Sequence, residues 1–167
     1  MKTIHQLSLV FVSAMILFST SCKKDDAETT PVPTPTPTPN NTTCNYTTNV
    51  LVIDGTVKAI LSDSCRVFGT NYYTEHFADA AKTEGIAIIF DGTALPAAGT
   101  YTAVNTFAAV APGKAYVEYY NITNAYQPAS GTITVTDNGS SKIYTFCTFS
   151  CTDGTTTKVV SLRSKCN

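Results

Sequence analysis

Turn dipeptides divide residues 44–167 of this chain into short apolar runs. Asp54-Gly55, Asp91-Gly92 and Asp153-Gly154 each follow such a run, and Asp137-Asn138-Gly139-Ser140 follows another. Asp-Gly and Asn-Gly favour the positive backbone φ angles that tight hairpin turns require. The spacing of the turns is typical of antiparallel sheet proteins.

The apolar runs between these turns have the composition of strands, because Val, Ile, Tyr and Thr are abundant in them. Residues 131–136 alternate cleanly, with Ile133 and Val135 directed inward and threonines outward. No strand–helix alternation is present, so we expect an all-β fold, an antiparallel sandwich or barrel of about eight or nine strands. The expected strands are 50–53, 57–61, 65–73, 86–90, a turn and strand in 95–101, 115–123, 131–136, 142–151 and 157–163.

Residues 74–85 fit two local structures. Thr74 could cap a short helix with Phe77, Ala80 and Ala81 on its inner face and Gly85 at its end. The same residues could form a loop between strands. We favour a loop or a single helical excursion.

The first 21 residues have the order of a secretory signal. A basic start at Lys2 precedes an apolar core over 7–18, which ends in the small residues Ser19, Thr20 and Ser21. The core is shorter than the ~20 apolar residues that a membrane span needs. A cysteine, Cys22, follows at the position where such a signal is cleaved.

The segment Ser19-Thr20-Ser21-Cys22, followed by Lys23-Lys24-Asp25-Asp26, resembles the lipid-attachment sequence of Bacteroidota lipoproteins. The resemblance implies that the thiol of Cys22 is acylated, that cleavage makes Cys22 the first residue, and that its amine is acylated too. Two or more acyl chains anchor a protein stably. We therefore expect an outer-membrane lipoprotein, and we favour export to the cell surface over a spacer role for the charged tract. A soluble secreted protein and an uncleaved anchor are the alternatives.

Residues 22–43 follow as a lipidated N-terminus and tether, which contains the tract ETTPVPTPTPTPNNTT. Proline fixes its own φ and holds the preceding residue extended, so the tract favours polyproline II, a spacer of ~3.1 Å per residue. The tract has almost no apolar side chains with which to form a core. The expected organisation is a signal in 1–21, a disordered tether in 22–43 and a β domain in 44–167.

The β domain also has a weak family resemblance. Residues 86–90 with 95–101, and residues 129–136, are similar to small all-β domains of uncharacterised Bacteroidota lipoproteins. These families imply no activity, so the resemblance assigns no functional residue.

One of the six cysteines is Cys22, and the rest lie in the β domain. Disulfides are expected in an exported protein, and an odd number leaves at least one thiol unpaired within the molecule. Cys147 and Cys151 would lie ~13 Å apart on one strand, too far for a bond to each other. Cys166 could pair with Cys44 or Cys65, so we expect one or two bridges of open connectivity. Cys147 and Cys151 are a poor match to a zinc site, and we expect no metal.

Little in the chain indicates catalysis or a cofactor. The net charge of −1 gives no basic surface for nucleic acid, and no phosphate-binding glycine loop is present. After signal cleavage His76 is the remaining histidine, beside Glu75 and Asp79. No nucleophile motif accompanies it, so we interpret His76 as a solvated loop residue and expect no enzyme. A small hydrolase around His76 is the least favoured alternative.

The strongest binding candidate is the strand that contains Tyr116-Val117-Glu118-Tyr119-Tyr120. Alternation places Tyr116, Glu118 and Tyr120 on one face, where two rings flank a carboxylate. The face could bind a glycan or peptide, or it could only stabilise the sheet by cross-strand packing. The absence of Trp weakens the glycan alternative. We expect a lipid-anchored envelope domain that binds or has a structural role, whose partner, an envelope protein or a glycan, is unspecified.

Overall fold

The computed structural model describes residues 44–166. The signal (1–21), Cys22 and the tether therefore lie outside the described residues. The described part of the chain contains no helix long and apolar enough to span a membrane. It consists of strands and one 3-10 helix. These are β1 (Val50–Ile53), β2 (Thr56–Ala59), β3 (Leu61–Phe68), β4 (Tyr72–Ala78), β5 (Gly85–Asp91), β6 (Gly99–Val104), η1 (Phe107–Ala109), β7 (Lys114–Tyr120), β8 (Ala125–Pro128), β9 (Thr132–Asn138), β10 (Ser141–Thr152) and β11 (Thr157–Lys165).

The expected all-β class is confirmed, with eleven strands instead of eight or nine. They form one sheet in the order β2-β1-β11-β10-β9-β6-β7-β5-β4-β3, and β8 pairs with both β7 and β10. The pairing is antiparallel except between β6 and β7, which run parallel. Residues 105–113, which include η1, make the crossover that a parallel pair requires.

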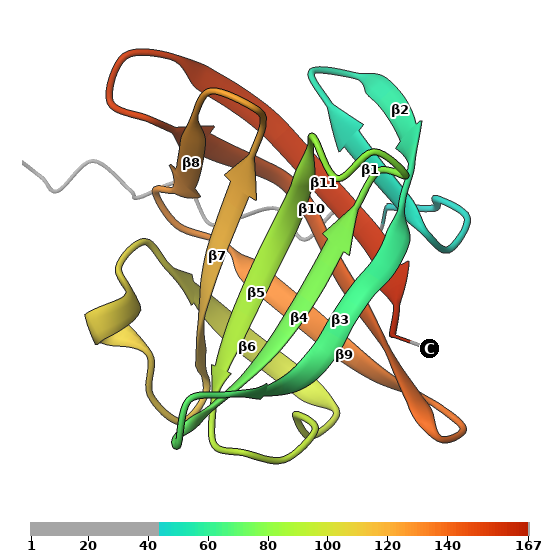
Figure 1. The fold of residues 1–167 in the computed structure, drawn as a ribbon, viewed down its shortest axis with the longest axis vertical. Helices are drawn as coiled ribbons and strands as arrows, with labels where there is room; N and C mark the ends of the chain where they lie inside the picture. Colours follow the sequence, from blue (N-terminus) through green and yellow to red (C-terminus); the bar gives the residue numbers. More distant parts are fainter. Residues whose placement is uncertain (1–43, 167) are drawn as a thin grey trace, which may run out of the picture. The chain divides into compact units, whose positions relative to one another are not determined.

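The sheet folds over on itself, so that two of its parts face each other. In Figure 1, β3, β4, β5 and β7 lie in front of β9, β10 and β11 and cross them at an angle. Alternate side chains of both parts fill the space between them. The largest fully buried ones are Tyr119, Tyr144, Phe77, Phe90, Phe146, Leu51, Ile86, Ile88, Ile133 and Leu162. The arrangement is a barrel-like sheet with a continuous apolar core.

The expected strand 65–73 is wrong, and of the loop or helix expected in 74–85 only a loop over 79–84 is present, because β4 continues to Ala78. The chain instead forms a hairpin in which β3 turns at Gly69, where φ is 63°, and returns as β4. The alternation of β4 directs Glu75 and Phe77 inward, and a carboxylate at a core position hid the strand pattern. After β4, Asp79 accepts hydrogen bonds from the backbone N–H groups of Thr83 and Glu84, and these bonds form a turn instead of a helix.

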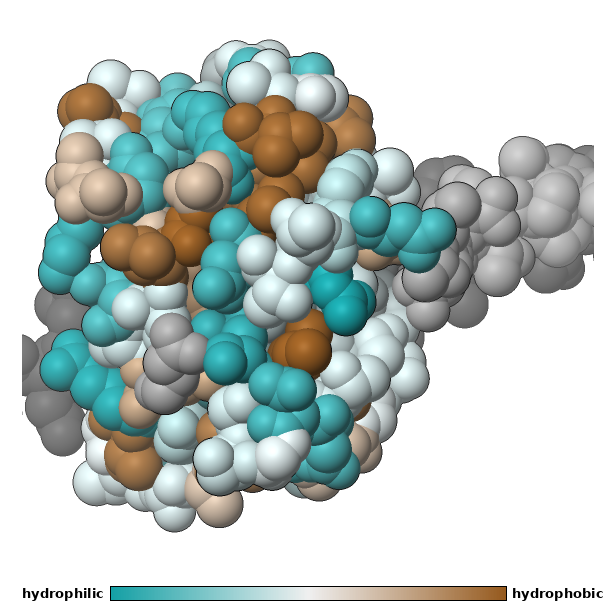
Figure 2. All heavy atoms as spheres, turned by 90° about the vertical axis from the view of Figure 1, so that its right-hand side faces the viewer, coloured by the Kyte–Doolittle hydropathy of each residue, from teal (hydrophilic) through white to brown (hydrophobic). Residues whose placement is uncertain are grey.

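The strands at the two ends of the sheet order leave apolar side chains exposed. Val57 on β2 is 62% exposed and Leu61 on β3 is 61% exposed. Figure 2 shows the side of the domain where these strands lie in Figure 1, with hydrophobic side chains interrupting a largely hydrophilic surface. Strand β2 has only four residues, and β3 pairs with β4 across a register shift between Ser62 and Ser64. Short and irregular edge strands limit pairing with other chains.

Candidate functional site

Tyr116, Glu118 and Tyr120 lie together on the outer face of β7, as the alternation predicts. All three are half-buried, whereas Val117 and Tyr119, on the opposite face, are buried. Strands β5 and β4 extend this outer face on one side and β8 on the other. Neighbouring strands therefore surround the candidate residues with partners that the sequence did not identify.

Glu118 is held in place by two donors. The Tyr116 hydroxyl donates a hydrogen bond to its carboxylate, and the Gln127 side chain on β8 donates a second one over 3.2 Å. Burial, followed by the bond to Glu118, raises the pKa of Tyr116 to about 12. The phenol therefore stays protonated and acts as a donor at any physiological pH.

An aromatic cluster adjoins Glu118. It consists of Phe68, Tyr72, Phe107 and Tyr116. The ring of Phe107, from η1, lies over the sheet with its centroid 4.5 Å from that of Tyr72 and 6.3 Å from those of Phe68 and Tyr116. Phe107 remains 38% exposed and Phe68 49% exposed. The cluster thus presents apolar ring surface to solvent beside the oriented Glu118 carboxylate.

The sequence did not predict this cluster, because its members come from separate elements. Phe68 ends β3 and Tyr72 begins β4, whereas the sequence pattern predicts one strand over 65–73. Phe107 lies in the crossover between β6 and β7, where no periodic pattern marks it. Predicting the turn at Gly69 would have placed Phe68 and Tyr72 opposite each other. No local sequence pattern predicts that Phe107 packs on them.

At the other end of the face, His76 joins two residues. Its Nε2 lies 2.7 Å from the Tyr120 hydroxyl and its Nδ1 lies 2.9 Å from the carboxylate of Asp63. The His76 and Tyr120 rings stack 5.4 Å apart, and Lys82 forms an ion pair with Asp63. Hydrogen bonds from Lys82 and then His76 lower the pKa of Asp63.

The interpretation of His76 as a solvated loop residue is therefore wrong, because β4 holds it within a hydrogen-bonded chain. The side-chain hydrogen bonds that the structure describes for His76 lead to Asp63 and Tyr120, and the side chains of Cys65 and of serines are not among its partners. Burial raises the pKa of Tyr120, so its phenol is protonated near neutral pH. A Cβ at Gly85 would lie 2.5 Å from the Tyr120 hydroxyl, and the glycine thus admits the ring against β5. This arrangement positions side chains and shows no activated nucleophile.

The five cysteines form two disulfides and leave one thiol. Cys44 is bonded to Cys147 and Cys65 to Cys166, so the expected bridges are present and Cys147 does not pair with Cys151. Cys151 is buried and free, and burial raises the pKa of its thiol to about 12. A thiol of this kind is unreactive at neutral pH.

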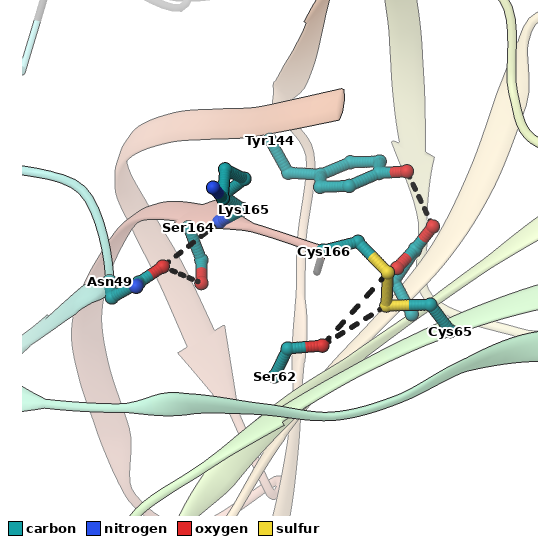
Figure 3. The surroundings of a disulfide bond; sticks show 8 residues. Asn49, Ser62, Cys65, Tyr144, Ser164, Lys165 and Cys166 are labelled. Atoms are coloured by element: carbon teal, nitrogen blue, oxygen red, sulfur yellow. Dashed lines mark hydrogen bonds between the residues drawn. A yellow bond between two sulfur atoms is a disulfide. The ribbon is translucent and has the colours of Figure 1, made fainter. Parts of the chain in front are cut away.

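Inside the sheet, the Cys65–Cys166 disulfide lies next to a buried carboxyl group, that of Glu75. Figure 3 shows Ser62 hydrogen-bonded to both sulfur atoms, with Tyr144 directed toward the same region. The Tyr144 hydroxyl donates to Glu75. Among the described residues, Cys65, Glu75 and Cys166 form a group whose potential metal-ligand atoms lie within 4.8 Å of one another. Because the sulfurs are bonded to each other, we assign no metal to it.

The chain was compared with protein-family models, with curated proteins and with solved structures. No family model, curated protein or solved structure matches it.

Proposed function

We propose that this protein is a lipid-anchored domain of the cell envelope that binds a ligand without transforming it. Cys22 carries the anchor, and the outer face of β4, β5, β7 and β8 binds the ligand. The observation that carries the proposal is the aromatic cluster: Phe107 comes from outside the sheet to lie on three other rings, yet keeps 38% of its surface exposed. If these side chains served only to stabilise the sheet, burying that apolar surface would make the fold more stable.

A glycan fits this face better than a peptide. A sugar ring has an apolar C–H face, which stacks on aromatic rings, and a rim of hydroxyls, which need fixed polar partners. The face supplies both, with Phe107 and Phe68 as ring surface and Glu118 and Gln127 as oriented polar groups. An extended peptide is bound most readily along a free strand edge, whereas β7 is paired on both sides.

Binding is expected to depend on Phe107. With the mature chain in detergent and an array of envelope and capsular glycans, Phe107→Ala should weaken binding at least about tenfold, the loss of one aromatic contact of ~1.4 kcal/mol. Glu118→Gln should weaken it as well, because a carboxylate acceptor becomes an amide. Val159→Ala is the matched control, since Val159 is an exposed apolar residue on β11. Equal affinity of Phe107→Ala and Val159→Ala, or selective retention of peptides on a parallel peptide array, would exclude glycan binding by this face.

Membrane attachment is expected to depend on Cys22. Cells grown with labelled palmitate should label the wild-type chain, and Cys22→Ala should carry no label and leave the membrane fraction. Cys151→Ala is the control for cysteine loss, because the buried thiol of Cys151 is unpaired in the structure. Equal labelling of wild type and Cys22→Ala would refute the lipid anchor.

A further inference from the structure

Glu75 is a carboxyl group that the fold of the sheet leaves half satisfied. Its side chain is fully buried on β4. One oxygen, Oε1, accepts a hydrogen bond from Tyr144 on β10, and the other, Oε2, has no partner among the described residues. A buried polar atom without a partner destabilises a fold by about 1–3 kcal/mol, so its retention calls for an explanation.

The unpartnered carboxyl lies beside the Cys65–Cys166 disulfide. A carboxylate oxygen of Glu75 and both sulfur atoms are within 4.8 Å of one another. No comparable carboxylate accompanies the Cys44–Cys147 disulfide in the described part of the chain. The two bridges therefore differ in their chemistry although they span similar lengths of chain.

The same disulfide can be reached from solvent. A hollow of about 250 Å³ is lined by both its cysteines, together with Tyr73, Leu95, Ser140 and Ser141. Cys65 is half-buried, whereas Cys166 is only 6% exposed. An incoming thiol therefore meets the sulfur of Cys65 first, and Cys166 becomes the sulfur that departs into the interior.

We propose that Cys65–Cys166 is an exchange-active disulfide, open to thiols through this hollow, and that Glu75 gives its proton to the departing sulfur of Cys166. The attacking thiolate forms a bond to Cys65 Sγ, and the bond between the two cysteine sulfurs breaks. The electron pair goes to Cys166 Sγ, which takes the proton of Glu75. A second thiol then releases Cys65, so that two thiols become one external disulfide and the protein holds two thiols.

The surroundings of Glu75 suit it to this role. Burial raises the pKa of Glu75 to about 7, and the hydrogen bond from Tyr144 opposes this effect only in part. Among the described residues, the other titratable groups that face it are Tyr144 and Tyr73, whose pKa values are raised by burial and by Glu75. Both phenols stay neutral and place no charge beside Glu75. Because its pKa is about 7, Glu75 is protonated at mildly acid pH and can act as the acid. Ser62, which contacts both sulfurs, is too weak an acid to replace it.

The test uses the full mature protein with reduced glutathione. After acid quenching and alkylation, mass spectrometry measures the reduction of each disulfide in the same molecules. At pH 6.5, Cys65–Cys166 should be reduced at least about tenfold faster than Cys44–Cys147. Glu75→Gln should slow the first at least about tenfold and leave the second unchanged. The rate per thiolate should fall above pH about 7 in the wild type but not in Glu75→Gln.

A second variant separates proton transfer from mere loosening of the fold. Tyr144→Phe keeps the acid but removes the bond that lowers the pKa of Glu75, so the fall in rate should move to higher pH. Cys44–Cys147 serves as the internal control, because a loosened fold would speed the reduction of both bridges. Equal rates for the two disulfides, or a Glu75→Gln rate that matches the wild type at every pH, would overturn the proposal.

Discussion

Replacing Cys65 and Cys166 together by alanine is expected to lower the free energy of unfolding by about 2–5 kcal/mol. The bridge joins residues 101 apart in sequence, so it restricts the unfolded chain strongly. It also joins β3, which ends the strand order, to the residue that follows β11. Contacts between β3 and β11 close the sheet there without a ladder of backbone hydrogen bonds among the described strands. Urea denaturation followed by circular dichroism measures the loss.

The matched control is Cys44→Ala with Cys147→Ala. That bridge spans 103 residues, so the effect on the unfolded chain is nearly the same. It fixes the chain before β1 and does not close the sheet. The Cys65/Cys166 variant should therefore be the less stable of the two. If its unfolding midpoint equalled that of the wild type, the Cys65–Cys166 bridge would not stabilise the closed sheet.

The protein is expected to become less stable as the pH rises from 5 to 8. Folding raises the pKa of Glu75 from 4.5 to about 7, so the folded chain holds a proton that the unfolded chain releases. This contribution is fully present below pH about 4.5 and is lost as the pH rises through about 7. A shift of this size corresponds to up to about 3 kcal/mol. Unfolding curves in urea at pH 5 and pH 8 measure the difference.

Glu75→Gln should remove most of that pH dependence, because glutamine stays neutral and keeps an oxygen for Tyr144. Glu118→Gln is the control, since Glu118 is a half-buried carboxylate on the outer face. The lowered pKa values of Asp54, Asp63 and Asp153 act in the opposite direction, and their stabilisation is lost only at acid pH. A pH dependence in Glu75→Gln equal to that of Glu118→Gln would contradict the assignment to Glu75.

The local sequence pattern was sufficient to predict much of the sheet. The alternation of 131–136 and of the β7 strand placed Ile133, Val135 and Tyr116 on their observed faces, because a period of two has one physical solution when one face is buried. Asp54-Gly55 predicted a real hairpin, since β1 and β2 pair across it.

The features that the sequence did not predict depend on tertiary contacts. Glu75 at a core position broke the apolar pattern of β4, and its partner Tyr144 is 69 residues away. The parallel pairing of β6 with β7 follows from a crossover that has no sequence signature. The disulfide connectivity depends on closure of the sheet, which brings Cys65 to Cys166. The aromatic cluster depends on Phe107, which only the path of the crossover places on the outer face.

The Cys44–Cys147 disulfide also determines how a mechanical load enters the domain. Cys44 is the first described residue, and its bond leads to β10, a strand that is paired on both sides. A pull on the chain ahead of Cys44 therefore reaches the middle of the sheet through a covalent bond and bypasses β1. Strand β1 is therefore not the first strand to carry the load, which falls instead on β10 and its pairing with β9 and β11. A load applied on the N-terminal side of the domain is therefore borne by a central strand of the sheet.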